Sequence, residues 1–245
     1  MHISHFDNSR YLAALFALFL MAAGLYFVTN STTAWALPDP RSLYGKTIVF
    51  DVHRNGEKVG HHHVVFENSE DSLKVNSTFQ LEIKLLFIVA YRFTYISDEV
   101  WQNGQLIELK SDVNDDGDKA LIELSRDTSG LKISGPEGTE MTSGPLYVTT
   151  HWNSAVINEN RVLNTLTGRI NRVDIKRLKI EIIDTENGPV SATRFAYTGD
   201  LDTEVWYDDT GRWVKMKFKG RDGSDIEYKC IKCQGGVEQN EPSTR

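Results

Sequence analysis

The sequence predicts an all-β, mainly antiparallel protein, built as a closed or half-open β-barrel of about ten or more strands. Short alternating runs of polar and apolar residues recur from Thr47 to Tyr228, and Asn-Gly or Asp-Gly pairs separate them at hairpin spacing. One stretch, Pro145 to Gly168, instead repeats its apolar residues every three or four positions, as a helix does. We expect this stretch to form one short helix, or two helical turns, that acts as a lid or plug on the apolar face of the sheet.

The expected role of residues 1–36 is that of a signal peptide. Arg10 precedes an unbroken apolar or small run from Tyr11 to Val28, and Ala34-Trp35-Ala36 fits an Ala-x-Ala cleavage site. We expect cleavage after Ala36 and a secreted, periplasmic product. Because the apolar run is nearly long enough to cross a membrane, the alternative is an inner-membrane anchor with the domain facing the periplasm.

The rest of the chain fits one domain. Residues 37–233 are enough for a single antiparallel β-barrel-like domain with its own core, and the polar stretch at 234–245 is expected to be a disordered tail. The net charge of −7 opposes binding to nucleic acid and adsorption to anionic lipid headgroups. We therefore expect no nucleic-acid partner.

The first hairpin is predicted by Asn55-Gly56, which lies between alternating runs at Thr47–Arg54 and Glu57–Phe66. Successive residues of a strand point to opposite faces, so a regular two-residue turn fixes which residues share the apolar face. On this register His61 and His63 both point into the interior.

Two inward histidines separated by one residue suit a transition metal when a third ligand is near. His151 or Glu99 could supply that ligand, although the sequence does not place either of them beside the pair. The other interpretation is two histidines that are hydrogen-bonded within a polar patch. A metal-dependent enzyme that uses His61 and His63 therefore stays open, while no nucleophile elbow, phosphate-binding loop or zinc-peptidase motif is present in the sequence.

The most apolar stretch after the signal segment is Phe79 to Tyr95, where every odd position is apolar. A straight strand of this length would exceed the span of the domain, so we expect a bend or turn near Lys84 to Ile88, where both faces are apolar. The stretch either crosses between two packed layers or forms the apolar rim of a cavity mouth. The expected ligand-binding residues are Phe79, Leu85, Phe87, Tyr91, Phe93, Trp101 and Trp152.

The remaining strands follow from the same signals. Turns are predicted at Asn103-Gly104, Asn114–Gly117, Ser129-Gly130 and Gly135–Gly138. After the central stretch, strands are predicted at Arg169–Ile175, Leu178–Asp184, Val190–Thr198, Glu204–Tyr207, Trp213–Phe218 and Ile226–Tyr228.

The segment from Asp112 to Glu123 matches the spacing of a calcium-binding loop, with oxygen ligands at its first, third and fifth positions, a glycine at the sixth and a glutamate at the twelfth. The flanking residues read as strands rather than helices, and Lys119 stands where an apolar residue normally closes such a loop. An acidic hairpin turn explains the segment more simply, because Asn, Asp and Gly are the residues that tight turns require. We therefore expect no cofactor, with calcium as an alternative.

Cys230 and Cys233 are the only cysteines. This spacing suggests redox chemistry or half of a zinc site in a reducing compartment. In an exported protein the pair favours a local disulfide that fastens the last strand, because such compartments are oxidising.

Several blocks of the sequence resemble one family. They are Asn55-Gly-Glu-Lys-Val-Gly-His61, Tyr91-Arg-Phe93, Glu99-Val-Trp101, Thr150-His-Trp-Asn153 and Val205-Trp-Tyr-Asp208. These blocks are similar to an uncharacterised family of proteobacterial exported proteins, a domain of unknown function. The likeness extends distantly to envelope proteins whose curved sheet wraps a helix, including lipoprotein carriers. It implies a periplasmic setting and a cavity or groove, and it transfers no catalytic residue.

The function that we expect is therefore binding of an apolar or lipid-like ligand in the barrel. The alternatives are the metal-dependent enzyme and a structural or assembly partner in the envelope that uses the apolar rim as its interface. Within the central stretch, Trp152 is expected to join the lid to the sheet, and substitution of His151 should be much milder.

Overall fold

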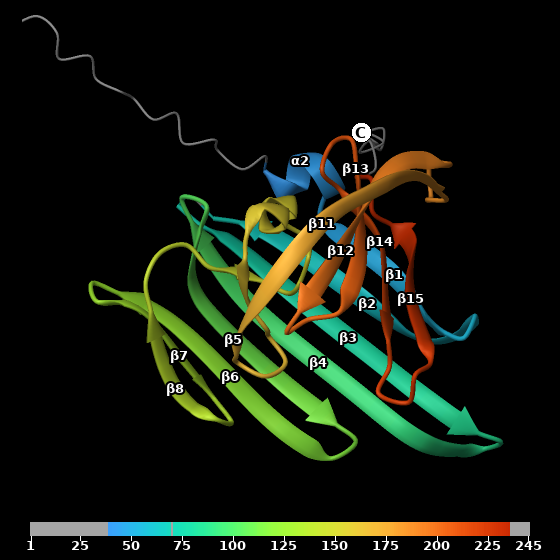
Figure 1. Ribbon diagram of the computed structural model, residues 1–245, viewed down its shortest axis with the longest axis horizontal. Helices are drawn as coiled ribbons and strands as arrows, with labels where there is room; N and C mark the ends of the chain where they lie inside the picture. Colours follow the sequence, from blue (N-terminus) through green and yellow to red (C-terminus); the bar gives the residue numbers. More distant parts are fainter. Residues whose placement is uncertain (1–38, 70, 236–245) are drawn as a thin grey trace, which may run out of the picture. The chain divides into compact units, whose positions relative to one another are not determined.

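The computed structural model describes residues 39–69 and 71–235 (Figure 1). The predicted signal peptide and residues 236–245 of the predicted tail lie outside the described residues. Within the described part of the chain, no helix combines the length and the apolar character needed to cross a membrane.

Fifteen strands form one sheet, and nearly all neighbours are antiparallel. The strands are β1 (Thr47–Arg54), β2 (Glu57–Asn68), β3 (Leu73–Leu85), β4 (Ile88–Gln102), β5 (Gln105–Asp115), β6 (Asp118–Asp127), β7 (Gly130–Gly135), β8 (Gly138–Thr142), β9 (Tyr147–Val148), β10 (Arg161–Leu163), β11 (Ile170–Ile183), β12 (Val190–Gly199), β13 (Thr203–Asp208), β14 (Trp213–Lys219) and β15 (Asp225–Lys232). Their order is β8-β7-β6-β5-β4-β3-β2-β1-β15-β14-β13-β12-β11-β10-β9. The all-β, mainly antiparallel prediction is thus confirmed, and the first and last of the described strands, β1 and β15, pair with each other.

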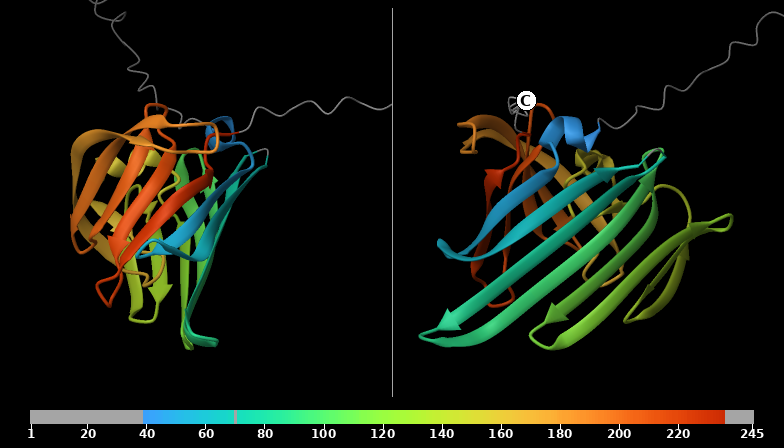
Figure 2. Two further views of the ribbon diagram at one scale, coloured as in Figure 1. Left: turned by 90° about the vertical axis from the view of Figure 1, so that its right-hand side faces the viewer. Right: turned by 180° about the vertical axis from the view of Figure 1, so that it is seen from behind.

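The sheet curls into a barrel-like trough but does not close (Figure 2). Its two ends, β8 and β9, are not neighbours in the hydrogen-bonded order. Side chains cross this seam instead: an Arg161 guanidinium N–H donates to the Thr142 hydroxyl over 2.8 Å, and Arg169 forms an ion pair with Glu137. Of the two predicted alternatives, the half-open form is the correct one.

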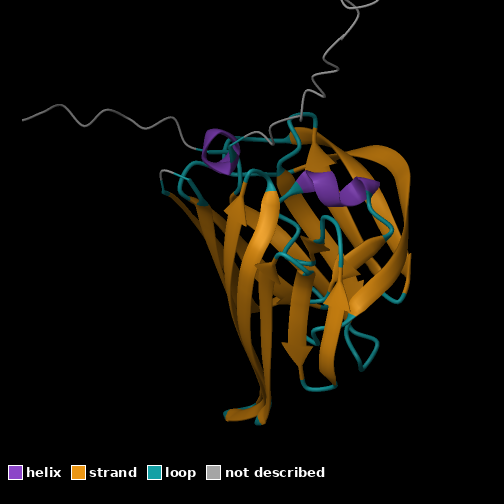
Figure 3. Cartoon of the chain, turned by 90° about the vertical axis from the view of Figure 1, so that its left-hand side faces the viewer, coloured by secondary structure: helices purple, strands orange, loops and turns teal. Residues whose placement is uncertain are grey.

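The central helix predicted for residues 145–168 is wrong. This stretch contains β9, a five-residue 3-10 helix η2 (Ser154–Asn158) and β10, joined by irregular chain (Figure 3). A continuous helix is interrupted at His151, whose φ of 59° is left-handed. The carbonyl oxygens that a helix would pair internally are satisfied from elsewhere, since the hydroxyl of Tyr207 donates to His151 and that of Tyr44 donates to Trp152.

A short helix lies instead in the Pro-rich lead-in. Helix α2 (Pro40–Tyr44) begins after Asp39, whose carboxylate accepts the backbone N–H of Arg41 over 3.0 Å, and proline occupies its first turn. Tyr44 at its end is completely buried, and its ring stacks on Phe66 with the centroids 5.6 Å apart. The helix therefore anchors the start of the described chain over one end of the sheet.

Candidate ligand-binding cavity

A cavity of about 580 Å³ opens on the concave side of the sheet. One wall is formed by β3 and β4, and the opposite wall by β14 and β15, with residues 149–151 and 164–166 of the central stretch between them. The apolar lining side chains include Phe79, Leu81, Ile83, Tyr91, Phe93, Tyr95, Met216, Phe218, Ile226 and Tyr228. A mostly apolar hollow of this size is typical of sites for small molecules.

The strand register explains how this lining is built. Phe79 lies opposite Tyr95 and Leu81 opposite Phe93, so each cross-strand pair places two large apolar side chains on one face. The next inward pair is Ile83 with Tyr91, close to the β3–β4 turn. The pairs therefore form a track that runs from that turn toward the middle of the barrel.

Charged groups surround the outer end of the cavity. Arg54 pairs with Asp222 over 2.5 Å, and Arg221 pairs with Asp115 over 2.8 Å. The Tyr91 hydroxyl donates to the other oxygen of Asp115 over 2.7 Å; burial and this carboxylate raise the pKa of Tyr91 to about 12. These residues line the cavity and tie the β14–β15 turn to β1 and β5, so the mouth is polar while the walls are apolar.

Two histidines lie at the inner end. His62 from β2 and His151 from the central stretch both line the cavity, and both rings contact Trp213, at centroid distances of 5.6 and 5.9 Å. Burial lowers the pKa of His62 to about 3, helped by the neighbouring His151, and burial lowers that of His151 to about 4. Both imidazoles are therefore neutral at neutral pH.

A second buried polar group lies beside the cavity, on β4. The Glu99 carboxylate accepts the indole N–H of Trp101 over 2.8 Å and that of Trp152 over 3.1 Å. Burial raises the pKa of Glu99 to about 7, and the two indole donors oppose that rise because they favour the carboxylate. Glu99 is thus a buried carboxyl group that titrates near neutrality.

A family described as a domain of unknown function, DUF6134, matches residues 50–231, which is most of the chain. The chain belongs to this DUF6134 family. No curated protein matches it.

Among solved structures, the DUF6134 domain is similar to a beta-barrel-like protein of unknown function, DUF1849, from Brucella abortus. The TM-score is 0.55 at 9% sequence identity, and the match covers 77% of this chain and 96% of that chain. At this identity the likeness shows a shared barrel-like fold alone.

In this DUF6134 domain, the seven residues expected to bind ligand fall into three places. Phe79, Tyr91 and Phe93 line the cavity. Trp101 and Trp152 are buried around Glu99 and are not among the cavity-lining residues. Leu85 and Phe87 are 70% and 100% exposed at the β3–β4 turn, so the predicted turn is correct but its side chains point to solvent.

The inward orientation predicted for His61 and His63 is wrong. Val59 is an extra residue in β2, so Val52 pairs with Gly60 and the histidines shift by one position. His62 is buried inside, while the rings of His61 and His63 lie 4.8 Å apart on the outer face. Metal binding by this outer pair stays a prediction that elemental analysis tests.

A glycine allows this bulge. A Cβ atom on Gly60 would lie 2.0 Å from the carbonyl oxygen of Gln80, so only glycine lets β3 approach so closely. Sequence reasoning missed His62 because a bulge has no reliable local signal. The tripeptide of histidines next to Gly60 is the one clue that the sequence contains.

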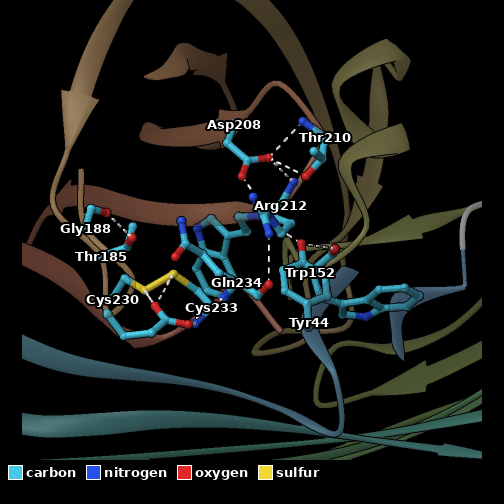
Figure 4. A network of polar contacts seen from close by, with 12 residues as sticks. Tyr44, Trp152, Thr185, Gly188, Asp208, Thr210, Arg212, Cys230, Cys233 and Gln234 are labelled. Atoms are coloured by element: carbon cyan, nitrogen blue, oxygen red, sulfur yellow. Dashed lines mark hydrogen bonds and ion pairs between the residues drawn. A yellow bond between two sulfur atoms is a disulfide. The ribbon is translucent and has the colours of Figure 1, made fainter. Parts of the chain in front are cut away.

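The calcium-loop-like segment forms a hairpin, and the cysteine pair forms a disulfide. The segment from Asp112 to Glu123 belongs to β5, β6 and the turn between them, and the amide oxygen of Asn114 accepts the backbone N–H of Gly117 over 2.8 Å. Cys230 and Cys233 form the predicted disulfide (Figure 4). With Glu186, these cysteines are the one group of three metal-ligating residue types that the described residues bring together, and the disulfide occupies both sulfur atoms.

Glu186 fixes the chain beyond the disulfide. Its carboxylate accepts the backbone N–H groups of Cys233 and Gln234, each over 2.8 Å. Arg212 donates to the carbonyl oxygen of Gln234 over 2.8 Å and pairs with Asp208 over 2.6 Å (Figure 4). The disulfide is therefore part of a network that holds the end of the described chain to the barrel.

Proposed function

We propose that the protein is exported to the periplasm and binds an apolar or amphipathic, lipid-like ligand in the cavity. The observation that carries the proposal is the mostly apolar lining contributed by paired strands, with a polar mouth at one end. Such a lining favours an acyl or similar chain over a polar metabolite, because burial of apolar surface drives its binding. The Cys230–Cys233 disulfide supports an oxidising compartment. The proposal assigns no catalytic residue.

Native mass spectrometry of protein recovered from the periplasm tests the proposal. We expect a bound lipid mass, together with binding of an uncharged fluorescent probe, N-phenyl-1-naphthylamine, to the delipidated protein. L81W should weaken probe binding at least about tenfold, because the indole fills the middle of the lining. The matched control is I96W, since Ile96 lies on the other face of β4 and is exposed. A mass equal to that of the chain alone, together with no probe binding, would overturn the proposal.

A second candidate function rests on the β3–β4 turn. Residues 85–89 are five consecutive exposed apolar residues, and the hairpin extends beyond its neighbours (Figure 2). We propose that this tip docks into an apolar groove of an envelope protein partner, because a convex row of large apolar side chains is costly to leave in water.

In-cell photocross-linking tests this docking. A photoreactive residue in place of Phe87 should give one discrete protein adduct, and the same residue in place of exposed Leu121 on β6 should not. The L86S substitution should remove that adduct while the thermal melt is unchanged. Adducts with lipid alone, or the same adducts from both positions, would remove the protein-partner candidate.

A further inference from the structure

The inner end of the cavity contains polar atoms that the protein itself does not satisfy. Within the described residues, neither ring nitrogen of His62 has a hydrogen-bond partner, and the Nδ1 of His151 has none. These side chains are 6% and 3% exposed, and both line the cavity. Thr150 lines the same space, and its hydroxyl lies near Glu99 without a hydrogen bond of normal geometry.

Such a cluster is uncommon, because buried polar groups in natural proteins are nearly always hydrogen-bonded. The surroundings on the protein side are aromatic and offer little compensation. The His62 ring meets the edges or faces of Phe79, Trp213 and Tyr228 at centroid distances of 6.0, 5.6 and 5.5 Å. Both residues line the cavity, so a polar group bound there can supply the hydrogen-bond partner that the described residues do not.

The backbone of His151 adopts an unfavourable conformation. His151 has a φ of 59°, which non-glycine residues rarely adopt. Its carbonyl oxygen accepts the Tyr207 hydroxyl over 2.8 Å, and the next carbonyl accepts the Tyr44 hydroxyl over 2.9 Å. Two buried tyrosines thus fix an unfavourable conformation that directs the imidazole to the cavity lining, as is typical of functional positions.

The side chains that line the inner end, His62, Thr150 and His151, carry no charge at neutral pH. Each neutral imidazole presents one N–H donor and one acceptor nitrogen, and a threonine hydroxyl can do both. The ionised lining groups, namely Arg54, Asp115, Asp202, Lys219, Arg221 and Asp222, come from strand ends and turns around the mouth. An ionised head group would lose its hydration at the inner end without gaining a partner of opposite charge.

We infer that the inner end of the cavity is a head-group site, where His62 and His151, with Thr150 beside them, hold an uncharged hydrogen-bonding head such as an alcohol, an amide or a protonated carboxylic acid on an apolar chain. This inference rests on the proposed function. It adds the chemical class of the head group and the orientation of the ligand in the cavity. The head enters first, and the chain lies along the pairs formed by β3 and β4.

Competition against N-phenyl-1-naphthylamine with ligands of one chain length tests this site. The probes are tetradecanol, tetradecanamide, tetradecyl sulfate, tetradecyltrimethylammonium and tetradecane, each added to the delipidated full-length protein. We expect the alcohol and the amide to compete at least about tenfold better than the two permanent ions and the hydrocarbon. This series needs no variant and therefore stands even if a substitution impairs folding.

Variants of His62 assign the effect to the site. H62F keeps a ring of similar size but removes both nitrogens, so the advantage of the alcohol over the hydrocarbon should be lost. H62Q keeps a donor and an acceptor and should retain most of the advantage of the alcohol over the hydrocarbon. H61F, the same change at the neighbouring outer position, is the matched control and should leave the series unchanged.

Equal competition by all five ligands, or tighter binding of either ion, would overturn the head-group site while the proposed function stood. An advantage of the alcohol that survives H62F would also overturn it. If the probe itself does not bind the unmodified protein, the proposed function fails and the head-group site fails with it.

Discussion

The indole Nε1 of Trp152 lies 3.1 Å from the Oε2 of Glu99, a residue 53 positions away in the sequence. This hydrogen bond joins the central stretch to β4, and the Trp152 ring also packs edge-on against Trp101 and Phe66. The expectation that Trp152 connects the central stretch to the sheet is therefore confirmed, although the stretch is not a helix.

Replacing Trp152 by alanine should lower the free energy of unfolding by about 3–5 kcal/mol, because the change leaves a large cavity and removes one donor from a buried carboxylate. Urea denaturation gives the value. I96A, at an exposed position of the neighbouring strand, should change stability by less than about 0.5 kcal/mol. Equal stability of W152A and the parent protein would mean that the central stretch is only a surface connection.

The stability of the protein should depend on the ionisation of Glu99. Its pKa in the folded state is about 7, against 4.5 ordinarily, so between these values the folded state binds a proton that the unfolded state has released. The contribution of protonated Glu99 is therefore fully present below pH 4.5 and is lost as the pH rises through 7.

E99Q removes this ionisation and keeps an oxygen acceptor for the indoles. From pH 4.5 to pH 8, E99Q should gain about 3 kcal/mol of stability relative to the parent. Urea denaturation across this range is the measurement, with exposed E108Q as control. The two buried histidines have the opposite effect, because their protonation in the unfolded state lowers the stability of the protein as the pH falls below 6.5. The difference between variant and parent removes this contribution. A difference that does not change with pH would contradict the assignment.

Gly60→Ala should destabilise the protein by about 1–3 kcal/mol or more, because the added methyl group meets the carbonyl oxygen of Gln80. Gly56→Ala, in the turn of the same hairpin, meets no atom within 4 Å and carries only the cost of its positive φ. Thermal melts compare the two variants. If G60A melts no lower than G56A, the close approach of β3 at Gly60 is not required for the fold.

The Cys230–Cys233 disulfide closes a very short loop, so its removal should cost only about 2 kcal/mol. Denaturation of the C230A/C233A variant measures this cost, and addition of a reductant to the parent protein should reproduce it. A loss of the whole fold in the variant would show that the disulfide does more than fasten the last strand.

The hairpins could be predicted because their signals are local: Asn55-Gly56 and the alternation around it are sufficient to specify two paired strands. The central stretch could not, since the groups that replace its helical hydrogen bonds are Tyr44 and Tyr207, both distant in sequence. A helical spacing of apolar residues also fits a chain that contacts a curved sheet at irregular intervals.

The candidate site was predicted in part. Phe79, Tyr91 and Phe93 follow from alternation along one strand pair, but the exposed tip at Phe87 shows that apolar character alone does not place a residue inside. The histidines were assigned to the wrong face because one extra residue, Val59, reverses every side chain after it. His62 therefore emerges only when the register of β1 with β2 is known.

The pairing of β1 with β15 has a consequence for the way the chain folds. The first described strand, β1, lies at the centre of the sheet, and one of its two neighbours is β15, the last described strand in chain order. The two halves of the barrel cannot be joined until β15 has left the ribosome, and such distant contacts slow the folding reaction. A nascent chain of this topology stays incompletely folded until β15 has emerged, which is the state that the proposed export through a narrow translocation pore requires.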